Sequence, residues 1–357
     1  MILLLACSSI EPLDLPEDPA AWGVPIGVTQ VSGAVDVEVW YPAAEAHADD
    51  AGEEIGLGDF VPENVADRLG NPDLPTLSTR GVRDAAPRET DAAFPVVVFS
   101  HGFGGFRMQS LDYVEHLASR GYAVAAIDHE GRRFEDVLPC LFSPPLDGCA
   151  IETEDPGPDQ VPVLVDVLEG LGEEHLLGGR LDLEVMGLSG HSAGGATTAT
   201  LGETDERFSA LFSMAAPTGV DRDVPFASLG GSCDPYASPA DSSDALVHGH
   251  FLQVLGAGHM AFSDMCQMDI AALAEEHFGG RDDLNEAWYA QLLDLATNGC
   301  EGAKPAELEG CADGYLDLSV SAEVIRYAST SFFDAELLGA GDGPVDGVYA
   351  ELTAELR

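Results

Sequence analysis

Positive charge is scarce in this 357-residue sequence. Fifteen lysines and arginines face 63 aspartates and glutamates, which gives a formal net charge of −48, and Lys304 is the single lysine. Nucleic acids and anionic membrane surfaces attract basic patches, so this charge argues against both as partners. The acidity has two explanations: a high-salt environment that screens the mutual repulsion, or simply the solubility of an exported protein.

Long apolar runs are missing too. After the N-terminus, no stretch approaches the ~18–20 apolar residues of a membrane-spanning helix. The N-terminus, MILLLAC, resembles the end of a bacterial lipoprotein signal, although it lacks a basic residue and its apolar run is short. Cys7 is therefore a lipidation candidate, and we expect an extracytoplasmic protein, secreted or lipid-anchored at the bacterial cell envelope. A truncated or mis-started reading frame would explain the incomplete match, and the alternative is a start that is apolar by chance.

None of the cysteine spacings is CxxC, the usual zinc or redox motif. With Cys7 set aside, an even number of cysteines remains, which suggests disulfides in an exported protein. These six are Cys140, Cys149, Cys233, Cys266, Cys300 and Cys311. We find no internal repeat and no linker in mid-chain. We therefore expect a signal remnant at 1–7, a tether at 8–26 and a single domain at 27–357.

Hydrophobic patterning predicts alternating strands and helices. Alternating valines around a Ser-Gly turn predict a β-hairpin at 27–41. Residues 42–93 and 132–158 lack clean periodicity and are expected to be loops, with a short helix near PENVADRLG. The predicted strands are 95–100, 122–128, 183–188, 210–214, 225–230 and 250–255. Helices are predicted at 108–120, near 161–171, after Ser192, and from the last strand to the end of the chain. This alternation predicts an α/β protein with a mostly parallel central sheet and helices on both faces.

The stretch GHSAG, from Gly190 to Gly194, fits the pattern G-x-S-x-G. It follows a predicted buried strand and precedes a helix of small residues, which is the context that makes the pattern informative. The glycines permit a sharp turn that raises the Ser192 hydroxyl above the sheet, and the helix directs its N-terminal amides toward it. The alternative is a glycine-rich turn without chemistry.

A serine hydroxyl becomes a strong nucleophile only when a base takes its proton, so a histidine is expected downstream. VLGAGHMAFSD places His259 after a buried strand, in a glycine-rich loop. His101 and His191 lie in turns, where we expect structural roles. His248 and His250 share one strand face and could bind a metal, but no third ligand is in view, so we expect no metal site.

Three stretches, SHGFGGFR, YVEHLASRGYAVAAIDHEG and GHSAGGAT, together resemble the α/β-hydrolase family. The resemblance is to its platelet-activating-factor acetylhydrolase and dienelactone-hydrolase-like branch, and VEVWYP and SFFDAEL resemble that branch as well. The likeness covers most of Gly27 to Leu338. It implies the α/β-hydrolase fold, no metal or organic cofactor, and an oxyanion hole formed by the backbone N–H groups of Phe103 and Ala193.

The position of the expected catalytic acid differs from that in the acetylhydrolases of this branch. Ala215, in LFSMAAPTG, stands near the place where the acetylhydrolases carry an aspartate. Asp234 follows the next strand, which is the acid position of dienelactone hydrolases and cutinase-like polyesterases. The order Ser192, Asp234, His259 then matches the usual order of this fold. The other acids considered are Asp221 and Asp223 as alternatives, and Asp264 as a residue that braces its loop.

Cys233 directly precedes Asp234, and Cys266 lies seven residues beyond His259. A Cys233–Cys266 bridge would join the acid loop to the base loop, and some polyester-degrading relatives carry a similar bridge. The alternative is that both are free, buried thiols. The remaining cysteines would then form the pairs Cys140–Cys149 and Cys300–Cys311.

Together these features predict a monomeric serine carboxylic-ester hydrolase that works through an acyl-enzyme. Short- to medium-chain acyl esters are the expected small-molecule substrates, and polyesters are a further, polymeric class. A peptidase of the same fold is disfavoured because no large accessory domain is present. A catalytically silent surface binding protein on this fold is the alternative from another class.

Overall fold

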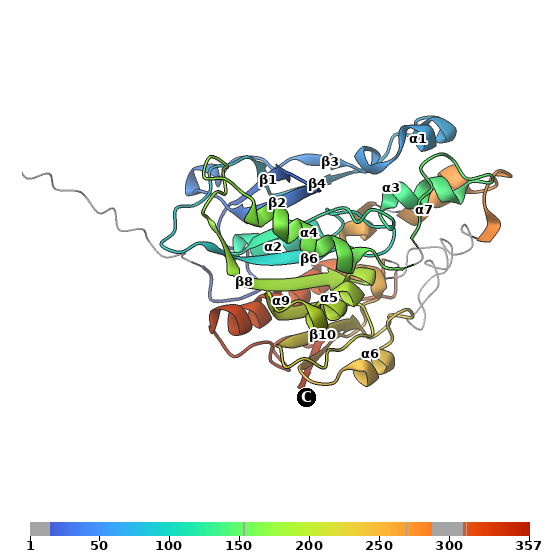
Figure 1. The fold of residues 1–357 in the computed structure, drawn as a ribbon. Helices are drawn as coiled ribbons and strands as arrows, with labels where there is room; N and C mark the ends of the chain where they lie inside the picture. Colours follow the sequence, from blue (N-terminus) through green and yellow to red (C-terminus); the bar gives the residue numbers. More distant parts are fainter. Residues whose placement is uncertain (1–14, 153, 269, 288–309, 312) are drawn as a thin grey trace, which may run out of the picture.

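The structure is a computed structural model, and it describes residues 15–152, 154–268, 270–287, 310–311 and 313–357 (Figure 1). A ten-stranded sheet forms its centre, in the order β12-β11-β10-β9-β8-β6-β7-β2-β1-β5, and β3 pairs with β4 in a separate small sheet. The strands are β1 (Ile26–Ser32), β2 (Asp36–Pro42), β3 (Glu54–Gly56), β4 (Thr76–Ser78), β5 (Val82–Arg83), β6 (Phe94–Ser100), β7 (Ala123–Ala126), β8 (Leu181–His191), β9 (Phe208–Met214), β10 (Phe226–Gly231), β11 (His250–Val254) and β12 (Leu352–Leu356).

The middle of the sheet is parallel. β6 pairs in parallel with β7 and β8, and β8 through β11 continue the parallel ladder. β1 and β2 form an antiparallel hairpin, which confirms the hairpin predicted at 27–41, and β2 joins β7 in an antiparallel pair. Because the carboxyl ends of parallel strands share one edge, residues that follow β6, β8, β10 and β11 gather there.

Helices cover both faces of the sheet, as the alternation predicted (Figure 1). On one face α2 and α9 pack on a core that includes Phe99, Val124 and Phe212. On the other face α4 and α5 pack on a core that includes Val98 and Leu188. The α-helices are α1 (Glu63–Leu69), α2 (Leu111–Ser119), α3 (Phe134–Val137), α4 (Gly157–Glu169), α5 (Ala193–Thr204), α6 (Pro239–Ala245), α7 (Ile270–Phe278) and α9 (Leu318–Leu338). The 3-10 helices are η1 (Glu45–His47), η2 (Leu57–Phe60), η3 (Leu138–Leu141), η4 (His259–Phe262) and η5 (Asp264–Met268).

The end of the chain differs from the prediction of helices only. After α9 the chain forms β12, which pairs antiparallel with β11 from Val254↔Leu352 to His250↔Leu356. Without β12, β11 would be an edge strand with unpaired backbone N–H and C=O groups, which an added strand satisfies. Only five residues form β12 and three of them are exposed, so its sequence carries little hydrophobic periodicity.

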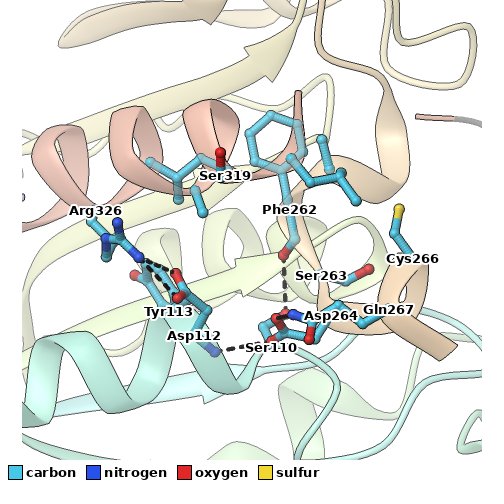
Figure 2. Close-up of a pocket in the computed structure, with 14 residues that line it drawn as sticks. Ser110, Asp112, Tyr113, Phe262, Ser263, Asp264, Cys266, Gln267, Ser319 and Arg326 are labelled. Carbon is cyan, nitrogen blue, oxygen red and sulfur yellow. Dashed lines mark hydrogen bonds and ion pairs between the residues drawn. The ribbon is translucent and has the colours of Figure 1, made fainter. Parts of the chain in front are cut away.

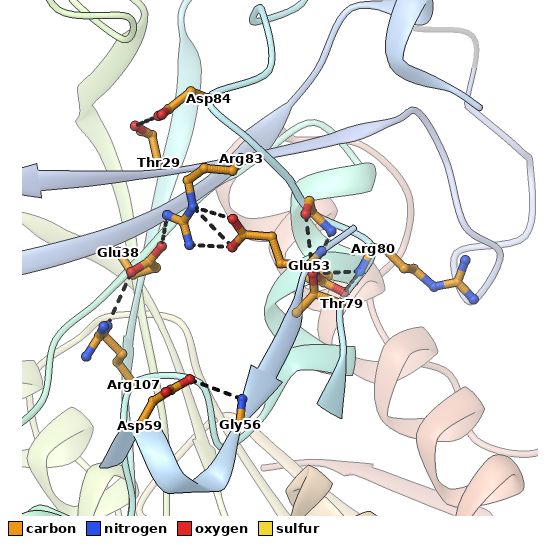
Figure 3. Close-up of polar contacts among 12 residues, drawn as sticks. Thr29, Glu38, Glu53, Gly56, Asp59, Thr79, Arg80, Arg83, Asp84 and Arg107 are labelled. Carbon is orange, nitrogen blue, oxygen red and sulfur yellow. Dashed lines mark hydrogen bonds and ion pairs between the residues drawn. The ribbon is translucent and has the colours of Figure 1, made fainter. Parts of the chain in front are cut away.

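An ionic network ties the sheet to the turn that precedes α2 (Figure 3). The Arg83 guanidinium contacts both Glu38, on β2, and Glu53. Arg107 donates through Nε to the second oxygen of Glu38 at 3.3 Å and also pairs with Asp128 after β7. The buried Glu38 carboxylate therefore bridges two arginines, and one of them belongs to the turn that carries the predicted oxyanion residue.

Within the residues that the structure describes, no helix combines the length and hydrophobicity needed to cross a bilayer. The described part of the predicted tether contacts α2: the Trp22 ring meets His116 edge-on, and the backbone N–H of Val24 donates to Ser119 O. Cys7 and the predicted signal remnant at 1–7 lie outside the described residues. Lipidation and the domain boundaries stay predictions.

Candidate active site

The GHSAG stretch forms the turn that its glycines predict. β8 ends at His191, α5 begins at Ala193, and Ser192 between them has φ 57° and ψ −117°. A positive φ is strained for a residue with a side chain and is commonly stored at functional sites. A Cβ at Gly190 would lie 2.2 Å from Gly194 O, and one at Gly194 would lie 1.9 Å from Ser100 O. The turn therefore needs glycine at both positions.

The three residues predicted to act together meet at the carboxyl edge of the sheet. His259 Nε2 lies 3.0 Å from Ser192 Oγ, and His259 Nδ1 lies 2.8 Å from Asp234 Oδ2. Since the carboxylate accepts from Nδ1–H, Nε2 is the ring nitrogen left to accept the serine proton. Ser192 follows β8, Asp234 follows β10 and His259 follows β11, so one edge of the parallel sheet positions all three.

Asp234 is held as a carboxylate although it is buried. Burial by itself would raise its pKa, but hydrogen bonds from His259 and from the backbone N–H groups of Ala237 and Tyr236 hold the pKa below its usual value. Both amides donate to Oδ1, at 2.9 and 2.8 Å, which leaves Oδ2 for the imidazole. This arrangement fixes the direction from which Asp234 meets His259.

The turn after β6 lies beside Ser192. A Cβ at Gly102 would be 3.3 Å from the Cβ of Ser192, so the backbone that leads into Phe103 runs next to the serine. Phe103 is 49% exposed, as expected for a residue that would contribute its backbone N–H and not its side chain. Ala193 is the first residue of α5, where N–H groups have no acceptor within the helix. The structure thus places both predicted oxyanion residues next to Ser192.

A buried arginine that the sequence analysis did not identify supports this turn. Arg132 Nη2 donates to His101 O at 2.8 Å and to Ser100 Oγ at 2.7 Å, while Arg132 O accepts from the N–H of Gly104 at 2.7 Å. Its Nη1 pairs with the partly exposed Asp155, which compensates the buried charge of Arg132. Arg132 thereby holds the backbone on both sides of Phe103.

The rival acids do not meet the histidine. Asp221 and Asp223 are exposed on the loop between β9 and β10. Asp264 is buried on η5, and its Oδ2 accepts from the N–H of Asp112 at 2.9 Å (Figure 2). Burial raises the pKa of Asp264 to about 7. Beside it, Ser110 Oγ donates to Phe262 O at 3.0 Å, so Asp264 and Ser110 brace the segment that follows the predicted base, as expected for Asp264.

A cavity of about 350 Å³ lies against this bracing segment, between the start of α2, η4–η5 and α9 (Figure 2). Ser110, Asp112, Asp264 and Arg326 are among its lining residues, and Arg326 Nη1 donates to Asp112 Oδ1 at 2.9 Å. Asp112 thus bonds to both Asp264 and Arg326 within the lining of this cavity.

The other histidines have structural partners. The His101 Nε2 accepts from the N–H of His129 at 2.9 Å, and burial lowers the pKa of His101 to about 4. His248 Nε2 lies 3.0 Å from Arg222 O, and the His250 ring packs edge-on against Phe332. Across the described part of the chain, no group of three histidine, cysteine or acidic side chains could hold a metal ion.

The disulfide pairing was predicted only in part. Cys140–Cys149 is confirmed. Cys266 pairs with Cys311, so the Cys233–Cys266 and Cys300–Cys311 pairs are wrong. Cys233 is itself disulfide-bonded, which excludes free thiols at both Cys233 and Cys266, and Cys300 lies outside the described residues.

Cys266 pairs with Cys311 because the chain makes a long-range contact next to the histidine loop. A Cβ at Gly310 would lie 3.1 Å from the backbone N of Ala261, and the N–H of Leu316 donates to Gly256 O at 2.8 Å. The chain therefore returns alongside residues 256–261 and brings Cys311 to Cys266. Spacing along the sequence carries no sign of this return.

Two comparisons with known proteins agree with this architecture. A family model for platelet-activating factor acetylhydrolase, isoform II, matches residues 36–134. The chain is also similar to the solved structure of a ferulic acid esterase from Streptomyces cinnamoneus, with 22% identity and a TM-score of 0.58 over 93% of this chain and 96% of that one. The predicted resemblance and fold are thereby confirmed: the protein is an α/β-hydrolase in fold, and residues 36–134 match the acetylhydrolase family.

Proposed function

We propose that this protein is a serine carboxylic-ester hydrolase, with Ser192 as nucleophile, His259 as general base and Asp234 as the acid that orients the base. The observation that carries the proposal is the hydrogen-bonded chain from the Ser192 hydroxyl through the imidazole to a buried carboxylate, at 3.0 and 2.8 Å. A hydroxyl that can pass its proton to an oriented imidazole is an activated nucleophile.

The reaction begins when Ser192 Oγ attacks the ester carbonyl carbon and its proton passes to His259 Nε2. The carbonyl oxygen becomes an oxyanion that accepts hydrogen bonds from the N–H groups of Phe103 and Ala193. Collapse of this intermediate breaks the bond to the alcohol oxygen, which takes the proton from the imidazolium and leaves an acyl-enzyme. Asp234 stabilises the imidazolium while it carries the proton.

Water completes the cycle. His259 takes a proton from a water molecule, the resulting hydroxide attacks the acyl carbon, and a second oxyanion forms in the same hole. Ser192 then leaves with the proton from the imidazolium, and the carboxylic acid is released. Over one turnover the serine proton leaves with the alcohol and a proton from water replaces it on Ser192, so the enzyme returns to its starting protonation state.

Short- to medium-chain acyl esters are the proposed substrates. The name of the matching family refers to an acetyl group and that of the similar structure to ferulic acid, and acetyl and feruloyl groups are both small acyl groups. Polyesters form a further proposed class, because Asp234 occupies the acid position of the cutinase-like polyesterases that the sequence resembles. The catalytic role of each residue requires no metal or organic cofactor.

An extracytoplasmic location is part of the proposal. Cys140–Cys149 and Cys266–Cys311 are both disulfides, and Cys233 is a further bonded cysteine. Disulfides form and persist in oxidising compartments, and they are rare in the cytosol of most organisms. Mass spectrometry of the mature protein tests the proposed lipid on Cys7.

The test is a panel of p-nitrophenyl esters from acetate to palmitate, together with an aromatic polyester film. We expect faster turnover of butyrate than of palmitate. Ser192→Ala should lose activity by on the order of 10³-fold or more, with the melting curve of the wild type. Equal activity in the two proteins would exclude Ser192 as the nucleophile and overturn the proposal. Failure of the wild type to hydrolyse any ester in the panel would favour the silent binding protein, and faster turnover of palmitate would overturn the substrate class.

A further inference from the structure

We propose that Gln109 and His191 are a pair of positioning residues that fix the oxyanion turn relative to the histidine loop. The pair would act on the reaction only through Gly102 and His259, whose backbones it holds. This inference rests on the proposed function, because its purpose is the alignment of the Phe103 N–H with the base.

Gln109 is the hub of the pair. It lies in the turn before α2 and is 3% exposed. Its Oε1 accepts from the N–H of Gly102 at 3.2 Å, and its Nε2 lies 3.0 Å from His191 Nδ1. Its backbone O accepts from the N–H of Asp264 at 2.7 Å. One residue therefore contacts the oxyanion turn, the nucleophile elbow and the end of the histidine loop.

His191 completes the connection. It is 2% exposed, and its Nε2 lies 3.0 Å from the backbone O of His259. The rings of His191 and His259 lie side by side, with centroids 4.9 Å apart. The x residue of the G-x-S-x-G pattern is thus bonded directly to the backbone of the proposed base.

The donors and acceptors allow one arrangement. Gly102 N–H needs an acceptor, so the amide oxygen of Gln109 faces it and the amide N–H₂ faces His191. His191 Nδ1 must then accept, and the proton on Nε2 is donated to the carbonyl of His259. Burial lowers the pKa of His191 to about 3, so the ring stays neutral, which is the state that this chain of bonds requires.

The contacts form a closed ring. Hydrogen bonds run from Gln109 through His191 to His259, the backbone continues to Asp264, and the Asp264 N–H bonds back to Gln109. Gly102 is joined to this ring by its hydrogen bond to Gln109. An oxyanion donor must lie at hydrogen-bond distance, about 2.7–3.1 Å, from the position that the oxyanion will take. A ring that joins the donor's turn to the base is suited to hold that distance.

Packing around the amide is close. A Cβ at Gly105 would lie 2.0 Å from Gln109 Oε1, so the turn lies directly on this side chain. Substitution of Gln109 by leucine keeps a similar size but removes the side-chain hydrogen bonds to Gly102 and His191, together with a long one to Ser110 Oγ at 3.5 Å. The substitution should therefore displace the Phe103 N–H through the backbone of Gly102, although no group that would touch the substrate is itself substituted.

The kinetic test compares Gln109→Leu with Tyr122→Phe. Tyr122 is fully buried, and its hydroxyl donates to Asp334 Oδ1 at 2.7 Å on α9, so its loss is a matched loss of a buried hydrogen bond elsewhere. We expect kcat for p-nitrophenyl butyrate to fall about 10- to 100-fold in Gln109→Leu, somewhat less than for the loss of an oxyanion donor itself. KM should stay within about threefold, because ground-state binding is unchanged.

A boronic acid that forms a tetrahedral adduct on Ser192 supplies the specific readout. Its inhibition constant should rise in Gln109→Leu by about the same factor as kcat falls. The control variant Tyr122→Phe should have a lower melting temperature but a kcat within about twofold of the wild type. A loss below about fivefold in Gln109→Leu, or an equal loss in Tyr122→Phe, would overturn the inference.

Nitrogen-15 NMR of the imidazoles in the wild-type protein keeps the test valid if Gln109→Leu does not fold. His191 should carry its proton on Nε2 alone from pH 5 to 9, and a proton on Nδ1 would overturn the inference. If wild type and Ser192→Ala hydrolyse esters equally, the proposed function has failed, while the NMR result still tests the hydrogen-bonded ring by itself.

Discussion

Removal of the Cys266–Cys311 disulfide should destabilise the protein more than removal of Cys140–Cys149. The two bridges close chain segments of very different length, with sequence separations of 45 and 9 residues. On the chain-entropy account, the longer bridge restricts the unfolded chain by about 4 kcal/mol and the shorter one by about 2.6 kcal/mol. The double serine variants should therefore differ by about 1.4 kcal/mol in free energy of unfolding.

The longer bridge also lies next to the proposed base. Cys266 Sγ is 3.7 Å from the backbone O of Met260, the residue after His259. Loss of the bridge frees Cys311 and the chain beside the histidine loop, so the alignment of the imidazole should suffer. Cys140 and Cys149 lie at η3 and in the loop after it, so their bridge offers a control of the same chemistry.

Urea unfolding of both double variants, followed by tryptophan fluorescence, measures the first effect, and kcat on p-nitrophenyl butyrate at 25 °C measures the second. We expect the larger loss of stability and the larger loss of kcat in Cys266→Ser/Cys311→Ser. Equal unfolding free energies would refute the loop-length argument. Equal kcat values in the two variants would refute the link between this bridge and the base.

Three further predictions follow from single contacts. Gly194→Ala should abolish activity or folding, because its Cβ would lie 1.9 Å from Ser100 O, whereas Gly230→Ala, which meets nothing within 4 Å, should keep both activity and melting temperature. Asp264→Asn should gain stability relative to wild type as pH rises from 4 to 8, because burial raises the pKa of Asp264 from 3.8 to about 7. The folded protein then holds this proton more tightly than the unfolded chain, so the contribution of Asp264 is full below about pH 4 and is lost as pH passes 7; melting temperatures that move in parallel would contradict this. Asp234→Asn should lower kcat by on the order of 10³- to 10⁴-fold with little change in melting temperature, and a loss below tenfold would exclude Asp234 as the acid.

The elements that were predictable are those fixed by local chemistry. The run from Phe94 to Ser100 is apolar enough to mark a central strand, and the glycines around Ser192 leave one sharp turn between strand and helix. Asp234 and His259 could be proposed because each follows a strand in the usual order of the fold. Their roles stay predictions, although the structure brings them together.

What escaped prediction depends on contacts between distant segments. Cys311 reaches Cys266 because the chain returns beside the histidine loop, and β12 forms because β11 offers an unpaired edge. Gln109 and Arg132 have no motif around them, since each is recognisable only from the buried groups that surround it in three dimensions. These partners are distant from Gln109 and Arg132 in the sequence, so local sequence patterns cannot predict the contacts.

The nucleophile is tested most directly by mass spectrometry of the protein after incubation with a p-nitrophenyl phosphonate ester. Attack by Ser192 Oγ on phosphorus would form one Oγ–P bond and release one p-nitrophenolate, with the serine proton passing to His259. We predict one adduct per chain, on Ser192, together with complete loss of esterase activity. An unlabelled Ser192 in a protein that still hydrolyses esters, or an adduct on another residue that accompanies the loss of activity, would contradict the account.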